Sequence, residues 1–226
     1  MLKSKITGDS YKPKLVDGAP KKLGEGTFGV VMSATNEKNG ETVAIKCSKN
    51  TITDKEKNTM LSIPPHKNIV QLLDHFCSET TDALWVVTKT HYLVMELATG
   101  DLEYFVKNVI SPENKEKGSP QGKENLQKYM NMLISGVKHL HLHKILHRDL
   151  KPANVLTFED NDDNIVLKIG DFGISKDIDA TKMTTGAGTI SYMAPEVFKT
   201  GHKYTKAVDF WSLGLVIYFL VTGEKR

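Results

Sequence analysis

The ten-residue stretch "HRDLKPANVL", residues 147–156, decides how the rest of the chain is interpreted. It brings Asp149, Lys151 and Asn154 together, between an amphipathic segment and a run rich in β-branched residues. Pro152 separates the acid from the amide, and because proline interrupts regular helices, these side chains are expected on a loop. A solvated polar turn would explain the same letters, so the surrounding sequence has to decide.

The composition is that of an ordinary globular protein. The 226 residues are 39% hydrophobic and 25% charged, which is enough to bury a sizeable core. The net charge is only +3, and almost all the basic residues are lysine, so no nucleic-acid partner is expected.

Two features concern the compartment. Cys47 and Cys77 are the only cysteines, and the N-terminus has no apolar signal core, which favours a reducing cytoplasmic or nuclear location. The most apolar segment begins at Phe210 and is shorter than the roughly 20 residues that a membrane span needs. It is interpreted as a buried core helix, and no membrane segment is expected.

Strand patterns dominate the first half of the chain. Residues 1–19 are lysine-rich, carry Pro13 and Gly18, and are expected to be a flexible lead-in. Three antiparallel strands are predicted over residues 21–48, with a turn at Asn39-Gly40, followed by a short helix over residues 54–63. Residues 68–76 and 91–97 are further strand candidates, with a loop or strand between them.

Helix patterns dominate from Asp101 onward. The segment over residues 124–143 repeats apolar side chains at helical spacing, which predicts one buried face, formed by Leu126, Met130, Leu133, Val137 and Leu140. The stretch that begins at His147 follows this predicted helix after three residues.

Three further motifs supply the chemistry that surrounds this stretch. The segment "GEGTFGVV" places Gly24, Gly26 and Gly29 in a strand-turn-strand, where backbone N–H groups can approach phosphate oxygens. Lys46 ends the strand segment "VAIK", apart from the glycine turn, which distinguishes the pattern from a Walker-type loop. Asp171 opens "DFG" and offers a carboxylate to magnesium.

With "APE" at residues 194–196 and "DFWSLG" from Asp209, these motifs resemble the eukaryotic protein kinase domain, in that family's order. The resemblance implies an α+β, two-lobed fold. An N-terminal lobe over residues 20–97 would hold an antiparallel sheet and one helix, and residues 98–226 would form a mainly helical C-terminal lobe. The chain stops just past the helix containing Trp211, so the last helices of that lobe are expected to be missing.

The resemblance also implies catalytic roles. Asp149 would accept the proton of the substrate hydroxyl, and Lys151 would neutralise charge on the transferring phosphoryl group. Asn154 and Asp171 would hold Mg²⁺, and Lys46 would clamp the α- and β-phosphates of ATP.

Lys46 would itself be held by a carboxylate from the helix that follows its strand. Counting back from residue 66 favours Glu56, because Met60 and Ile63 then share its helical face. Asp54 is the alternative partner of Lys46. The other interpretation of Glu56 is a solvated glutamate without any catalytic role.

The remaining nucleotide contacts are implied by the resemblance alone. The glycine loop would cover the phosphates, Asp101 would reach the ribose, and the adenine would lie among Val31, Ala44, Leu156, Met95 and the hinge backbone of Glu96 and Ala98.

Two positions suggest which hydroxyl is modified. Lys151 and Thr189 resemble the serine/threonine branch of the family, so a protein substrate with serine or threonine is expected. Arg148 suggests a switch, because a guanidinium beside the catalytic acid can grip a phosphate placed on Thr184 or Thr185 by an upstream kinase or by self-phosphorylation. A non-catalytic kinase-like scaffold is the competing interpretation.

Overall fold

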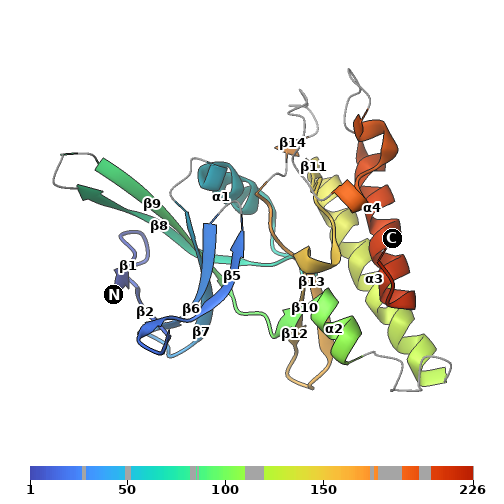
Figure 1. Ribbon diagram of the computed structural model, residues 1–226, viewed down its shortest axis with the longest axis horizontal. Helices are drawn as coiled ribbons and strands as arrows, with labels where there is room; N and C mark the ends of the chain where they lie inside the picture. The colour runs from blue at the N-terminus through green and yellow to red at the C-terminus, as the bar shows by residue number, and fades with distance from the viewer. Residues whose placement is uncertain are drawn as a thin grey trace. The chain divides into compact units, whose positions relative to one another are not determined.

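The computed structural model describes residues 1–26, 29–48, 52–81, 85, 87–109, 120–173, 176–177, 190–198 and 205–225 (Figure 1). The chain divides into two compact units. The first unit contains residues 1–62 and 71–97, and the second contains residues 63–70 and 98–226.

The first unit is built on an antiparallel sheet. Among the described residues its strands follow the order β1-β2-β6-β7-β9-β8, and β5 pairs with β6. The strands are β1 (Leu2–Lys3), β2 (Ser10–Pro13), β5 (Lys22–Gly26), β6 (Gly29–Asn36), β7 (Thr42–Ser48), β8 (Leu72–Thr81) and β9 (Val87–Glu96). A small hairpin of β3 (Leu15–Val16) and β4 (Ala19–Pro20) and one helix, α1 (Ile52–Ser62), complete the unit.

The three strands expected over residues 21–48 correspond to β5, β6 and β7, and α1 contains the predicted helix apart from its last residue. The turn between β6 and β7 uses Gly40, whose φ of 76° lies in the left-handed region that glycine adopts without strain. Strand β7 lies between β6 and β9 and buries Val43, Ala44 and Ile45, which makes it the centre of the sheet.

The strand expected over residues 68–76 begins later than predicted. Strand β8 starts at Leu72 because the preceding residues pair elsewhere: the backbone N–H of Val70 donates to Ile169 O at 2.9 Å in the second unit. Strand β8 instead continues to Thr81 and strand β9 begins at Val87, and the two long strands pair along their length (Figure 1).

The expected flexible lead-in over residues 1–19 is wrong for the strands that form there. Strand β2 pairs with β6 in the register Tyr11↔Asn36, and β1 pairs with β2. The physical reason is Tyr11, which is only 2% exposed and packs its ring on Phe76. The lysine content and the turn residues Pro13 and Gly18 favoured a flexible segment, and they gave no sign that Tyr11 is buried.

The second unit is mainly helical. Its helices are α2 (Leu102–Asn108), α3 (Pro120–Leu142) and α4 (Lys206–Thr222), and its strand pairs are β10 (Gly100–Asp101) with β12 (Val155–Glu159), β12 with β13 (Ile165–Ile169), and β11 (Ile145–Leu146) with β14 (Lys176–Asp177). Short 3-10 turns occupy Pro152–Asn154, Ile190–Tyr192 and Pro195–Phe198.

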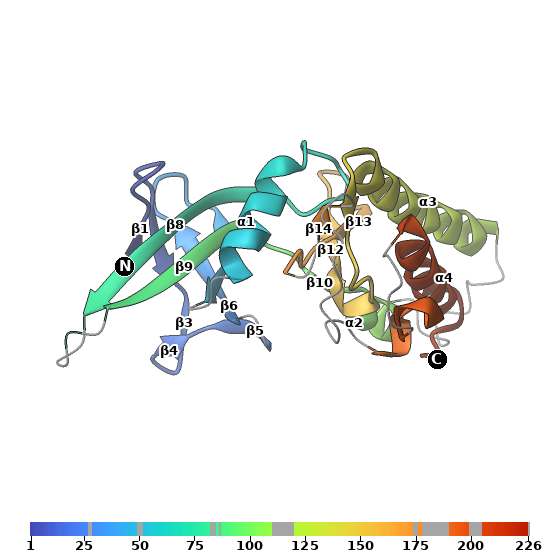
Figure 2. The ribbon, with the colours of Figure 1, turned by 90° about the horizontal axis from the view of Figure 1, so that it is seen from above.

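Helices α3 and α4 lie side by side in this unit (Figure 2). On α3 the predicted face is buried at Leu133, Val137 and Leu140. On α4 the side chain of Thr205 caps the N-terminus, and Gly223 ends the helix with a φ of 77°. Within the described part of the chain, no helix is long and apolar enough to cross a membrane.

Candidate active site

The stretch from His147 to Asn154 forms the loop between β11 and β12, as its proline predicts. Its acid lies at the centre of a short polar network. Lys151 Nζ donates to Asp149 Oδ2 at 2.8 Å, and Asn154 Nδ2 donates to the same oxygen at 3.1 Å and to Asp149 O at 2.8 Å. The sequence-predicted trio of acid, lysine and amide is therefore assembled in one unit.

A second acid, Asp209 on α4, fixes the backbone of this loop. Its Oδ2 accepts from the backbone N–H of His147 at 2.9 Å, and its Oδ1 accepts from the N–H of Arg148 at 2.8 Å. The ring Nε2 of His141 lies 2.8 Å from Oδ2. The Asp209 residue has 0% exposure, so its charge is compensated by these donors rather than by water.

Two residues of the site have strained backbones. Arg148 has a φ of 69° and Asp171 a φ of 58°, in the left-handed region where each such residue costs on the order of 1 kcal/mol. At Arg148 the bond from its N–H to Asp209 helps hold this conformation. The strain therefore lies at two of the residues singled out from the sequence.

The "DFG" segment is tied to the same loop within the second unit. His147 Nε2 lies 2.9 Å from Gly170 O, and the N–H of Gly170 donates to Asn154 O at 2.9 Å. The rings of His147 and Phe172 meet edge to face, with centroids 5.4 Å apart, and both are buried. Gly170, the residue before Asp171, therefore contacts the loop through both its N–H and its carbonyl oxygen.

Strand pairing positions two further predicted residues. Asp101 on β10 lies opposite Leu156 on β12. The Asp101 carboxylate also accepts from Tyr104 N at 2.8 Å and so caps α2, a structural role that the sequence did not predict. Ala98 lies just before β10 and is partly buried.

In the first unit, Lys46 forms a buried ion pair with Glu56. Its Nζ lies 2.8 Å from both Glu56 carboxylate oxygens, and the two side chains are 9% and 2% exposed. Asp54, the alternative partner, instead contacts Lys57 and His91 and is 44% exposed. Burial tends to raise the pKa of the Asp54 carboxyl, but the bond from Lys57 and the charge of His91 lower it overall.

The glycine turn and the predicted adenine residues lie on neighbouring strands of this unit. Gly26 pairs with Gly29 at the end of the β5–β6 hairpin, and Gly24 pairs with Val31. Gly29 has a φ of 136°, and a Cβ there would lie 2.2 Å from Cys47 O, so no other residue fits.

Ala44 lies opposite Met95 on β9, the next strand of the sheet. The neighbouring Glu96 accepts from Gln71 N at 2.9 Å, which fixes the end of β9. Apart from Glu56 on α1, the predicted first-unit residues therefore lie on the β5–β6–β7–β9 part of the sheet.

The oxygen donors fit magnesium by their chemistry. Asn154 commits its amide nitrogen to Asp149, which leaves the amide oxygen as its ligand atom, and Asp171 adds a carboxylate. Among the described residues no three His, Cys, Asp or Glu side chains gather into a metal site. Carboxylate and amide oxygens are ligands of the kind that a hard cation such as Mg²⁺ prefers.

Some predicted residues and contacts fall outside this description. Thr184, Thr185 and Thr189 lie outside the described residues.

The loop-anchoring roles of Asp209 and His141 were not predicted, although an acid within the otherwise apolar α4 is a sequence signal for a buried partnered charge.

Known proteins share this sequence pattern. A sequence model described as "Protein kinase domain" matches residues 19–226. A probable myosin light chain kinase of Dictyostelium discoideum is 36% identical over 207 residues, covering 89% of this chain and 60% of that protein. A calcium/calmodulin-dependent protein kinase type 1 of Caenorhabditis elegans is 36% identical over 208 residues, covering 89% of this chain and 54% of that protein.

A third relative, extracellular signal-regulated kinase 1 of Dictyostelium discoideum, is 35% identical over 214 residues, covering 90% of this chain and 37% of that protein. The chain thus spans less than two thirds of the length of these relatives.

Proposed function

Because the chain belongs to the protein kinase domain family, we propose that it transfers the γ-phosphate of ATP to serine and threonine hydroxyls of protein substrates. The observation that carries the proposal is the loop network, in which Asp149 contacts both Lys151 and Asn154 while Asp209 holds the loop backbone. A solvated polar turn would need neither the buried anchor nor the strained Arg148.

Asp149 acts as the base in this proposal. A substrate hydroxyl hydrogen-bonded to its carboxylate gives up its proton there, while the hydroxyl oxygen forms a bond to the γ-phosphorus and the bond from that phosphorus to ADP breaks. The contacts from Lys151 and Asn154 hold the Asp149 carboxylate in one orientation. Lys151 also places a positive charge beside the transferring group, where it stabilises the developing charge.

Nucleotide binding is assigned to residues of both units by their chemistry. In the first unit, Lys46 binds the α- and β-phosphates, and Glu56 keeps its ammonium oriented. The backbone of Gly24, Gly26 and Gly29 covers the phosphates.

The base and sugar contacts complete the assignment. The adenine lies against Val31, Ala44, Leu156, Met95 and the backbone of Glu96 and Ala98, and Asp101 bonds the ribose. Asn154 and Asp171 would hold Mg²⁺, which supplies charge neutralisation on the phosphates when bound.

Activation-loop phosphorylation is the regulatory part of the proposal. A phosphate on Thr184 or Thr185, added by an upstream kinase or by the chain itself, would pair with the guanidinium of Arg148. The backbone N–H of Arg148 donates to Asp209, so the point from which the arginine side chain extends is fixed. Mutating both threonines to alanine should give an enzyme whose rate no longer changes on phosphatase treatment.

The direct test of substrate class is phosphoamino-acid analysis. The chain is incubated with Mg²⁺, γ-labelled ATP and a mixed protein substrate, and the hydrolysed product is separated. We expect label on phosphoserine and phosphothreonine, with none on phosphotyrosine and none when EDTA replaces Mg²⁺. Label on phosphotyrosine alone would refute the proposed specificity, and its complete absence would favour a scaffold.

A further inference from the structure

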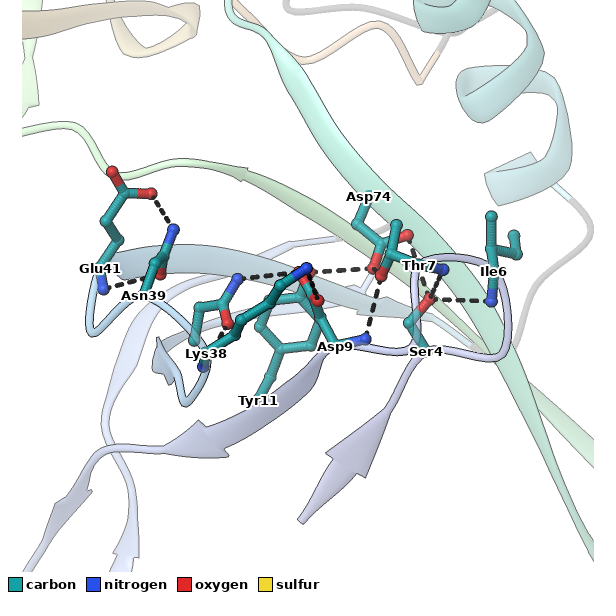
Figure 3. Close-up of polar contacts among 10 residues, drawn as sticks. Ser4, Ile6, Thr7, Asp9, Tyr11, Lys38, Asn39, Glu41 and Asp74 are labelled. Atoms are coloured by element: carbon teal, nitrogen blue, oxygen red, sulfur yellow. Dashed lines mark hydrogen bonds and ion pairs between the residues drawn. The ribbon is translucent and has the colours of Figure 1, made fainter.

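Residues 1–13, here called the N-terminal clasp, contact the rest of the first unit through one buried carboxylate (Figure 3). Asp74 on β8 is 5% exposed and accepts from three hydroxyls of the clasp. Ser4 Oγ donates at 3.2 Å, Thr7 Oγ1 at 2.8 Å and Tyr11 Oη at 2.9 Å. Three hydroxyls on one carboxylate form a lock between the N-terminus and β8.

The charge of this carboxylate is held by uncharged donors. Besides the three hydroxyls, the backbone N–H of His75 donates to Asp74 Oδ1 at 2.7 Å. Within the described part of the chain, no cation forms an ion pair with Asp74. Burial and the Asp74 charge raise the pKa of Tyr11 well above its usual range, so its phenol stays a donor. A negative charge added at Thr7 would lie beside the Asp74 carboxylate and repel it.

Closure of the clasp also completes the core. The Tyr11 ring stacks on Phe76 with centroids 5.9 Å apart. Asp9 accepts from Asn36 Nδ2 at 3.1 Å and pairs with Lys38 at 3.3 Å, which joins the clasp to the β6–β7 turn. Opening the clasp would therefore expose one edge of the first unit's core.

Among the three hydroxyls, that of Thr7 belongs to the accessible residue. Ser4 is 1% exposed and Tyr11 2%, whereas Thr7 is an exposed residue in the turn between β1 and β2. Gly8, with a φ of 78°, forms that turn. Thr7 Oγ1 also accepts from the N–H of Asp9 at 3.2 Å, so its hydroxyl supports both the turn and the lock.

We propose that the N-terminal clasp is phosphorylation-sensitive: Thr7 holds it closed as a free hydroxyl and opens it as a phosphothreonine. In the modification, Thr7 Oγ1 bonds to the γ-phosphorus of ATP, the bond from that phosphorus to ADP breaks, and the hydroxyl proton passes to the base of a serine/threonine kinase. The change removes a donor and places a charge of about −1.5 to −2 beside a buried carboxylate. The modifying kinase need not be this chain, so the inference stands apart from the proposed function.

The test uses the whole chain with genetically encoded phosphothreonine at position 7, measured by hydrogen exchange. We expect the amides of residues 9–12 to exchange about tenfold faster or more, since the hydrogen bond from Thr7 to the buried Asp74 carboxylate is lost. The same modification at Thr81, an exposed residue on β8, is the matched control and should leave those amides protected.

The source of the effect is tested by combining phosphothreonine 7 with Asp74→Asn, which removes the negative charge. The acceleration caused by the phosphate should be smaller in this background than in the wild-type chain. Unchanged protection in the Thr7-modified chain would overturn the proposal. Equal acceleration from positions 7 and 81, or an acceleration that Asp74→Asn leaves undiminished, would overturn it too.

Discussion

Asp209 is a charged residue in the apolar helix α4, and its burial is offset by three polar contacts to its carboxylate. Two of these donors are backbone N–H groups of the loop that carries Asp149. A buried carboxylate that loses its charge loses the stronger, charge-assisted bonds. Its position in α4 therefore links the stability of the second unit to the shape of the loop that carries Asp149.

Replacing Asp209 with asparagine should lower both stability and rate. The amide NH₂ would face a donor, so we expect a loss of about 2–3 kcal/mol in the free energy of unfolding, measured by urea titration. Asp162→Asn makes the same chemical change on an exposed residue and should stay within about 0.5 kcal/mol of wild type. Equal stabilities for the two variants would show that the anchor is not structural.

The pairing of Lys46 is tested by comparing two carboxylates on α1. Glu56→Gln replaces the charged acceptor 2.8 Å from Lys46 Nζ with a neutral amide, and should cost roughly 3 kcal/mol of stability, along with ATP affinity. Asp54→Asn alters a half-exposed pair and should cost less than about 1 kcal/mol. Isothermal titration with ATP and urea unfolding measure the two effects. A larger loss from Asp54→Asn would make Asp54 the functional partner.

At the scale of elements, residues 63–70 attach to α3 through stacked histidines. The His66 and His139 rings lie 4.4 Å apart, and the His143 ring lies 4.5 Å from that of His139. His66 Nδ1 accepts from Asn68 N at 3.1 Å, which requires an unprotonated nitrogen. Burial, His139 and the charge of Lys67 lower the pKa of His66.

This lowered pKa predicts a pH-dependent stability. Above the unfolded pKa of about 6.5, His66 is neutral in both states; as pH falls below that value, the unfolded chain binds a proton that the folded chain resists. Stability should therefore decrease from pH 7 toward the folded pKa. His66→Gln should weaken this decrease when urea unfolding is compared at several pH values. If the two pH dependences coincide, the histidine stack does not contribute.

Two helical glycines should respond to alanine in opposite directions. A Cβ on Gly136 of α3 would lie 2.9 Å from both Asn68 O and Ile169 Cδ1, so Gly136→Ala should destabilise by about 1–3 kcal/mol. At Gly214 of α4, no described atom outside the helix's own backbone and the neighbouring residues lies within 4 Å of such a Cβ, so Gly214→Ala should stabilise by about 0.5–1 kcal/mol through helix propensity. Thermal unfolding of both variants decides this, and a destabilised Gly214→Ala would contradict the packing of α4.

Local periodicity and turn residues were enough to predict β5, β6, β7, α1 and α3, because each carries its signal in contiguous residues. They were not enough for β2 or for the start of β8, where the deciding contacts come from distant residues. Tyr11 is buried by Phe76, and Val70 bonds to Ile169. Such partners lie outside any window of local sequence.

For the whole molecule, motif order was sufficient to predict the protein kinase fold, which the match over residues 19–226 confirms. The chemical roles of single site residues stay predictions that rest on the family pattern. The supporting contacts of Asp209 and Asp74 could not be predicted, because the partners of a buried charge are seen only in the three-dimensional structure.

The free thiols Cys47 and Cys77 add no covalent constraint, and burial raises the pKa of Cys47 to about 11.

The central claim is that Asp149 serves the transfer step rather than nucleotide binding. It is tested most directly by single-turnover phosphoryl transfer from labelled ATP to a protein substrate, in the wild-type chain and in Asp149→Asn, with ATP affinity measured on the same samples. We predict that the variant binds ATP like the wild type and transfers phosphate about 10²- to 10⁴-fold more slowly. A variant that transfers at the wild-type rate, or that loses ATP affinity in proportion to its rate, would contradict the claim.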